Sequence, residues 1–181
     1  MLQLQANAVG DQDLSERLNE AASRVNAVGR AYERLAYTAD YENIDLIEYL
    51  RQIISDLKPT VAPCNIHLDA SEAIRFAADR AILVGLIINE LVSNAGKYAY
   101  PDPAGGSIWV RVQTEKEAVA ISVRDEGIGL PPGFDPAKSK RLGTRLVNGL
   151  SKQLGGEVTR PPTPIGANFT LRIPLRSTTT R

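Results

Sequence analysis

Apolar residues between positions 14 and 35 recur at steps of four and three, which is the spacing of a seam in a helical bundle. They are Leu14, Leu18, Ala21, Val25, Val28, Tyr32 and Leu35. The opposite side of this segment is rich in Glu, Arg and Asn, so the pattern predicts an amphipathic helix with one stripe to bury. Residues 1–10 are too few to cover that stripe. We therefore expect a preceding helix or a second copy of the chain to pack against it.

From residue 41 to residue 100 the pattern changes from helical to extended and back. A helix is predicted over 46–57, with Asp45 as its N-cap, Glu48 at the capping-box position and Pro59 just beyond its end. Its apolar stripe consists of Leu46, Leu50, Ile53, Ile54 and Leu57. Residues 64–70 and 73–79 fit two short strands around a turn at 71–72. A long helix is then predicted to begin with Asp79 as its cap.

Beyond residue 100 strands predominate. Residues 106–115 and 117–125 alternate apolar and polar positions, which predicts a β-hairpin that turns at 115–117. Residues 126–141 are rich in Gly, Pro and Lys and predict a loop. A helix is expected from about 142 to 154, and the last strands, 156–160 and 168–175, flank a proline-rich turn. Residues 177–181 are predicted to be a disordered tail. The chain is therefore mixed α and β after an N-terminal helical part.

Composition and charge narrow the possible functions. The chain has 181 residues, 43% of them hydrophobic, which suffices for one domain with a sizeable core and an appended helical piece. Lys plus Arg equals Asp plus Glu, 21 each, so the chain has no net charge that would favour binding to nucleic acid or to an anionic membrane. The longest apolar run, 81–88, is too short to cross a bilayer, so we expect a cytoplasmic protein. Cys64 is the only cysteine, which excludes an intrachain disulfide and a cysteine-rich zinc site.

Two segments about thirty residues apart carry candidate chemistry. The first, NELVSNAGKYAY at 89–100, places Glu90, Asn94 and Lys97 along one side of the predicted long helix. The second, VRDEGIGLPPG at 123–133, is a strand that ends at Asp125 and continues into a glycine-rich turn. Either segment alone is compatible with an exposed helix face or a simple turn, but together they suggest a nucleotide pocket. A Rossmann fingerprint would instead need G-x-G-x-x-G opening a helix directly after a strand.

The order of motifs resembles the ATP-binding catalytic domain of sensor histidine kinases, in the superfamily shared with gyrase. NELVSNAGKYA, DEGIGLP, LGTRLVNGLSKQLGG and GANFTLRIP follow one another as in that family, and residues 22–53 resemble the second dimerisation helix and linker of the HWE and HisKA_2 type. The resemblance covers almost the entire chain. It implies an α+β fold, a two-layer α/β sandwich of the Bergerat type at 41–176, preceded by a partial dimerisation region at 1–40.

The same resemblance implies roles for residues of the first segment. Asn94 would hold Mg²⁺, which prefers oxygen ligands, and Lys97 would face the phosphates of ATP. Glu90 would polarise the attacking group or a metal-bound water. Tyr98 would either pack beside the adenine or close the core. Gly143 and Thr144, at the start of the predicted helix 142–154, resemble a second glycine box in which free backbone N–H groups favour phosphate.

Residues of the second segment would bind the base. Asp125 is expected to recognise adenine, because a carboxylate can accept a hydrogen bond from its exocyclic amine. Gly127 and Gly129 allow positive φ and a close approach of backbone to the purine. The loop 126–141 would then be an ATP lid, with Lys138, Lys140 and Arg141 as candidate phosphate contacts.

The implied function is transfer of the ATP γ-phosphoryl group to a histidine, and from there to an aspartate in a response-regulator receiver domain. The implied phosphoacceptor lies upstream of this chain, and the full-length protein would be a homodimer through the 14–35 helix. His67, the only histidine, lies in a predicted strand and is a poor acceptor.

The sequence departs from the family pattern at three places: the second glycine box reads GTRL, Ala167 stands where Thr is common, and Tyr32 stands where His is frequent. Two alternative functions stay open. One is a degenerate histidine phosphotransferase that docks a partner without binding ATP, and the other is a serine kinase of the anti-sigma-factor type.

Overall fold

The computed structural model describes residues 29, 43–70, 72–131, 133 and 142–175. The chain divides into two compact units, Met1–Tyr41 and Glu42–Arg181, and all labelled elements belong to the second. Apart from Gly29, which is helical, the helix predicted over 14–35 lies outside the described residues, as do the predicted tail and the lid residues Lys138, Lys140 and Arg141. None of the helices within the described ranges has the length and apolar character needed to span a membrane.

A five-stranded mixed sheet forms one layer of the second unit, in the order β2-β4-β5-β7-β6. The strands are β2 (Asn65–Ala70), β4 (Ser107–Thr114), β5 (Ala118–Asp125), β6 (Glu157–Thr159) and β7 (Asn168–Pro174). The β2–β4 pair is parallel and the other three pairs are antiparallel. A parallel pair needs a long crossover, which is provided by the helix between these strands.

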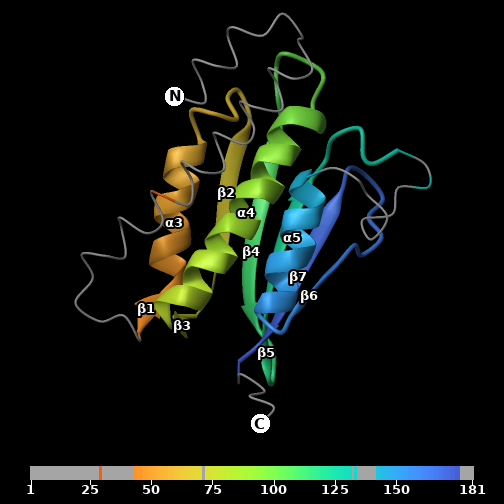
Figure 1. Ribbon diagram of the computed structural model, residues 1–181. Helices are drawn as coiled ribbons and strands as arrows, with labels where there is room; N and C mark the ends of the chain where they lie inside the picture. Colours follow the sequence, from red (N-terminus) through yellow and green to blue (C-terminus); the bar gives the residue numbers. More distant parts are fainter. Residues whose placement is uncertain (1–28, 30–42, 71, 132, 134–141, 176–181) are drawn as a thin grey trace, which may run out of the picture. The chain divides into compact units, whose positions relative to one another are not determined.

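Three helices, α3 (Leu46–Leu57), α4 (Ala78–Tyr98) and α5 (Leu142–Gln153), form the second layer and cover one face of the sheet (Figure 1). Alternate strand residues point toward them and are buried, among them Ile108, Val110, Ile121, Val123, Leu171 and Ile173. The predicted two-layer α+β sandwich is therefore confirmed. Its core is the space between the sheet and the helices, where each fully buried aliphatic side chain contributes roughly 1.5–3 kcal/mol.

Helix α3 forms as its sequence predicts. Asp45 Oδ1 accepts hydrogen bonds from the N–H groups of Ile47 and Glu48, at 3.0 and 3.1 Å, so the predicted N-cap is confirmed. Glu48 stands in the first turn of the helix, and its carboxylate accepts from Arg51 Nε at 3.3 Å. All five residues of the predicted apolar stripe are buried.

The segment before α4 differs from the prediction. The strand predicted over 73–79 is only β3 (Arg75–Phe76), and it pairs with β1 (Ile44–Asp45), a strand that the sequence pattern did not indicate. Helix α4 begins one residue before Asp79, after Ala77, and has no side-chain cap. The predicted Asp79 cap is therefore wrong. Burial of Phe76 and Ala78 accounts for this start, since packing against the core fixes the chain at that point.

The remaining elements agree with the sequence pattern to within about two residues. β4 and β5 form the predicted hairpin, closed by a hydrogen bond of 2.7 Å from Glu115 N to Ala118 O. Helix α5 ends where two glycines follow it. Gly155 has φ +67°, and the N–H groups of Gly155 and Gly156 bond back to Lys152 and Ser151 carbonyls at 2.9 Å. This is the usual way in which glycine ends a helix.

Candidate functional site

The polar residues predicted on the long helix lie along one side of the second half of α4. Their spacing of four, three and one residues from Glu90 through Asn94 and Lys97 to Tyr98 keeps them near one face. Exposure increases toward the end of the helix: Glu90 is buried, Asn94 is half-buried, and Lys97 and Tyr98 are exposed. Tyr98 is 50% exposed, so the alternative that it closes the core is wrong.

Asp125 ends β5 and is buried between two backbone segments. Its Oδ1 accepts hydrogen bonds from Gly127 N at 3.0 Å and from Ala167 N at 3.1 Å. A third bond, from Asp125 N to Ala167 O at 2.9 Å, fixes its backbone. Desolvation raises the pKa of this carboxyl, and the two N–H groups and nearby Arg124 act in the opposite direction. The carboxylate is thus held in one orientation at the end of the sheet.

The glycine-rich bend after Asp125 packs against the C-terminal end of α4. Ile128 N donates to Ala99 O at 2.9 Å, and a Cβ on Gly127 would overlap the Ala99 carbonyl. Gly129 has φ +76°, as predicted, but Gly127 is outside the positive-φ region, so that prediction for Gly127 is wrong. Gly127 is required here because the bend approaches α4 so closely.

Two residues that touch this site were not identified from the sequence as part of it. Gly166 has φ +71°, and a Cβ there would overlap the carbonyl of Asp125. Tyr100 donates its hydroxyl to Ser107 O at 2.5 Å and accepts from Glu126 N at 3.0 Å. For Gly166, the sequence does offer a usable signal, because a glycine directly after a proline-rich turn indicates an unusual backbone conformation. Tyr100 had no signal, because its role depends on Glu126, which is 26 residues away in the chain.

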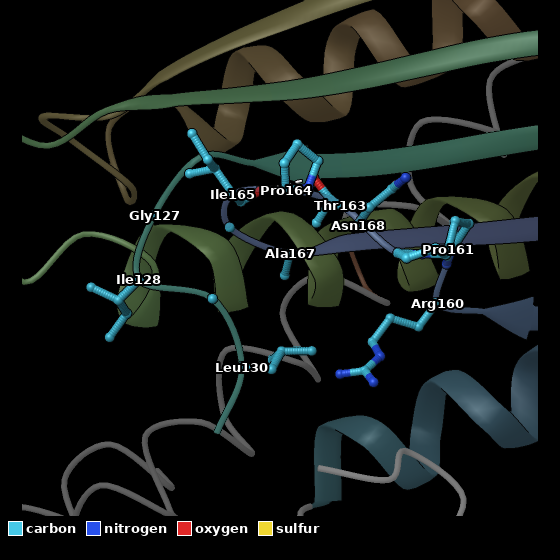
Figure 2. Close-up of a pocket in the computed structure, with 13 residues that line it drawn as sticks. Gly127, Ile128, Leu130, Arg160, Pro161, Thr163, Pro164, Ile165, Ala167 and Asn168 are labelled. Carbon is cyan, nitrogen blue, oxygen red and sulfur yellow. Dashed lines mark hydrogen bonds between the residues drawn. The ribbon is translucent and has the colours of Figure 1, made fainter. Parts of the chain in front are cut away.

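A cavity of about 530 Å³ lies beside the bend (Figure 2). Residues 127–130 form one wall and residues 160–168 form the other. Figure 2 shows the side chains of Leu130 and Arg160 approaching each other across it. The volume lies in the range of about 300–1,000 Å³ that is typical of ligand sites.

Only some of the predicted site residues line this cavity. Gly127 and Gly129 line it, and Asp125 binds two of its backbone N–H groups. Asn94, Lys97 and Tyr98 are not among its lining residues, and neither are Gly143 and Thr144 at the start of α5. Helix α5 contacts α4 directly, so both sets belong to the same helical layer. The described ranges hold no group of three or more His, Cys, Asp or Glu side chains suited to a metal ion.

Comparison with protein families gives two matches. Residues 79–177 match the model of the histidine kinase-, DNA gyrase B-, and HSP90-like ATPases, and residues 1–61 match a model described as histidine kinase, HisKA_2. The first match covers more than half of the chain, including α4, the bend after Asp125 and α5.

Similar proteins of known name are sensor kinases. The chain is 31% identical over 180 residues to the sensor histidine kinase PdtaS of Mycobacterium tuberculosis, covering 97% of this chain and 36% of that protein. It is 26% identical over 189 residues to blue-light-activated histidine kinase 2 of Erythrobacter litoralis, covering 97% and 52%. The chain therefore spans about a third to a half of the length of these relatives.

Solved structures share the fold. The histidine kinase domain of the Erythrobacter litoralis EL346 blue-light-activated kinase superposes with a TM-score of 0.71 at 26% identity, covering 94% of this chain and 79% of that one. Full-length ShkA in complex with AMPPNP superposes with a TM-score of 0.60 at 23% identity, covering 90% and 37%. From its motifs, its fold and these matches, the chain belongs to the family of histidine kinase-, DNA gyrase B- and HSP90-like ATPases, and its first 61 residues are similar to the HisKA_2 model.

Proposed function

We propose that this chain binds Mg-ATP and transfers the γ-phosphoryl group to a histidine, as the catalytic part of a two-component sensor kinase. The observation that carries the proposal is the state of Asp125: a buried carboxylate whose Oδ1 is fixed by two backbone N–H groups at the edge of a ligand-sized cavity. A buried carboxylate costs stability unless it is paired, so its presence favours a binding role over a structural one.

Asp125 would select adenine through its remaining oxygen. Because Oδ1 is held by Gly127 and Ala167, Oδ2 is the oxygen that would accept from the exocyclic amine of adenine. Guanine carries a carbonyl at that position, and two acceptors facing each other cannot form a hydrogen bond. Leu130 gives the cavity an apolar side chain for the ring, and the absence of a Cβ at Gly129 leaves room beside it.

The polar face of α4 would bind the phosphate end. Mg²⁺, when bound, would neutralise phosphate charge, and the Asn94 amide oxygen is suited to hold it because Mg²⁺ usually takes one or two protein ligands. Lys97 would face the phosphates, Tyr98 would lie beside the adenine, and Glu90 would polarise the attacking group or a metal-bound water. The backbone N–H groups of Gly143 and Thr144, in the first turn of α5, would bind phosphate.

The acceptor histidine would lie outside this chain, on an upstream segment or on a partner. His67 is the only histidine in the sequence, and it lies on β2 with its ring stacked on Trp109 at 5.7 Å. Its Nε2 lies 3.3 Å from Ser107 Oγ. A side chain held on a sheet in this way is poorly placed to enter an active site. The full-length kinase would be a cytoplasmic homodimer through the 14–35 helix and would pass the phosphoryl group to a receiver-domain aspartate.

Titration of Mg-ATP into the wild-type chain and the Asp125→Asn variant tests the binding step. Loss of a hydrogen bond to a charged group predicts affinity at least about tenfold weaker in Asp125→Asn. Asp69→Asn is the matched control, because Asp69 is exposed and pairs with Arg111 at 2.8 Å. Equal lack of affinity in wild type and Asp125→Asn would favour the docking module without ATP binding.

The transfer step needs a longer chain that includes the upstream helix. Incubated with ATP, that chain is expected to form acid-labile phosphohistidine. Acid-stable phosphoserine on a partner protein would instead support the serine kinase of the anti-sigma-factor type.

A further inference from the structure

We infer that Tyr100 is a positioning residue for the nucleotide site, because its hydroxyl holds the bend that follows Asp125. The inference rests on the proposed function and extends it to a residue that does not itself face the cavity.

The Tyr100 hydroxyl occupies a break in the β4–β5 ladder. The last register pair of these antiparallel strands is Ile108 with Asp125, so the next pair would join Ser107 to Glu126. Instead, the Tyr100 hydroxyl lies between them: it donates to Ser107 O at 2.5 Å and accepts from Glu126 N at 3.0 Å. One side-chain oxygen thus replaces a direct contact between two strands.

This inserted hydroxyl, which we call the Tyr100 bridge, explains why the chain leaves the sheet immediately after Asp125. A hydroxyl between the two backbones holds Glu126 away from β4, and the chain then turns onto the end of α4. There Ile128 N bonds Ala99 O at 2.9 Å, and Gly127 fits against the same carbonyl because it has no Cβ. The bend is therefore fixed to Ala99 by its backbone and to Tyr100 by a side chain.

The ring of Tyr100 is itself confined. A Cβ on Gly106 would overlap the ring, so the glycine before β4 provides the space in which the ring lies. Tyr100 is half-buried, and desolvation raises the pKa of its hydroxyl. The hydroxyl accordingly keeps its proton at neutral pH and remains a donor to Ser107 O. The fold therefore sets the position of the bridging oxygen.

The bridge acts on Asp125 through the backbone. Glu126 directly follows Asp125, and Gly127 N is one of the two donors that orient the Asp125 carboxylate. Without the hydroxyl, Glu126 N and Ser107 O lose their partner, and the bend can shift relative to β4. Such a shift would disturb the distance between Gly127 N and Asp125 Oδ1, and hence the oxygen that would bind adenine.

The test is Tyr100→Phe in the full chain, which removes the bridging oxygen and keeps the ring. The net contribution of ordinary hydrogen bonds predicts that the Kd values for Mg-ATP and Mg-ADP both rise about three- to tenfold. The two should rise by the same factor, because the base-binding end is affected and both ligands carry adenine. Tyr49→Phe is the matched control: it removes the same atom where α3 packs on α4, and should leave both Kd values within about twofold.

Binding is measured well below the melting temperature of every variant, and the melting temperature is recorded separately. A lower melting temperature with unchanged Kd values would overturn the inference, since it would show a purely structural role. A loss confined to ATP would overturn it as well. If Asp125→Asn weakens binding and Tyr100→Phe does not, the inference fails and the proposed function stands. If the wild-type chain binds no adenine nucleotide, both fail together.

Discussion

At the scale of single residues, Asp125 combines a stability cost with a proposed binding role. Burial raises its pKa, and two backbone N–H groups keep its carboxylate in place. A carboxyl whose pKa is raised by folding holds its proton more tightly in the folded chain than in the unfolded chain. The stability that the protonated Asp125 carboxyl contributes is therefore fully present below pH 3.8, the ordinary carboxyl pKa. It is lost as the pH rises through the raised pKa of the folded chain.

The Asp125→Asn variant should remove this cost without removing the backbone contacts, because the amide oxygen can still accept from Gly127 and Ala167. We expect the ligand-free variant to unfold at the same or a higher urea concentration than wild type at about pH 7. The difference should shrink as the pH is lowered toward the ordinary carboxyl pKa. A lower urea midpoint for the variant at neutral pH would show that the ionised carboxylate is net stabilising.

Sequence reasoning at this scale identified Asp125, Gly127 and Gly129, but not the contacts that Tyr100 and Gly166 make beside them. Asp125 can be recognised in the sequence because an acidic residue is unusual at the end of an apolar strand. Gly127 does allow a close approach of backbone, but the approach is to the end of α4, and a positive φ is not needed. Tyr100 could not be found in this way, because its hydroxyl joins Ser107 to Glu126, which lies 26 residues along the chain. Local spacing carries no information about such contacts.

At the scale of elements, the helices differ in how closely they pack. Gly85 in α4 lies against α3, and a Cβ there would come within 2.6 Å of Ile53 Cδ1 and 2.8 Å of the Tyr49 ring. Gly149 in α5 is exposed, and a Cβ there would meet nothing within 4 Å. Glycine is therefore required for close packing in α4, whereas in α5 it only lowers the stability of the helix.

Alanine at these two glycines should consequently have opposite effects on the free energy of unfolding. Gly85→Ala is expected to lower it by about 1–3 kcal/mol, because the added carbon overpacks the α3–α4 contact. Gly149→Ala is expected to raise it by about 0.5–1 kcal/mol, because alanine is the better helix former. Urea unfolding measures both. A rise in the free energy of unfolding for Gly85→Ala would contradict the packing described for α4, and a fall for Gly149→Ala would contradict the open space described at α5.

Helix and strand patterns predicted most elements because each buries one face of regular period. The buried stripe of α3 and the alternation in β4 and β5 are of this kind. The pattern failed where an element is too short to show a period. β1 and β3 contain two residues each, and they form because Ile44 and Phe76 are paired and buried together.

At the scale of the whole Glu42–Arg181 unit, the proposed nucleotide site joins segments from separate elements. The base would contact the end of β5 and the start of β7, and the phosphates would contact α4 and α5. Any ligand that binds only the folded chain stabilises it by mass action. Binding should therefore be visible in the thermal stability of the chain.

Mg-ATP at about 100 times its Kd is expected to add about 2.7 kcal/mol of stability. For a chain of this size that corresponds to a rise in Tm of roughly 5–10 °C. Mg-GTP at the same concentration should give a much smaller rise, because its carbonyl faces Asp125. Scanning calorimetry measures both. Equal shifts with the two nucleotides would contradict the role proposed for Asp125.

Residue type and local spacing are enough to predict the elements of regular period, the α+β class and the segments that carry the candidate chemistry. The remaining features arise from contacts in the folded chain. The tertiary structure set the start of α4 through packing of Phe76 and Ala78, and the shape of the bend through contacts with Ala99 and Tyr100. It also oriented the Asp125 carboxylate through N–H groups on both sides. These features depend on distances between residues remote in the chain, which only the folded protein defines.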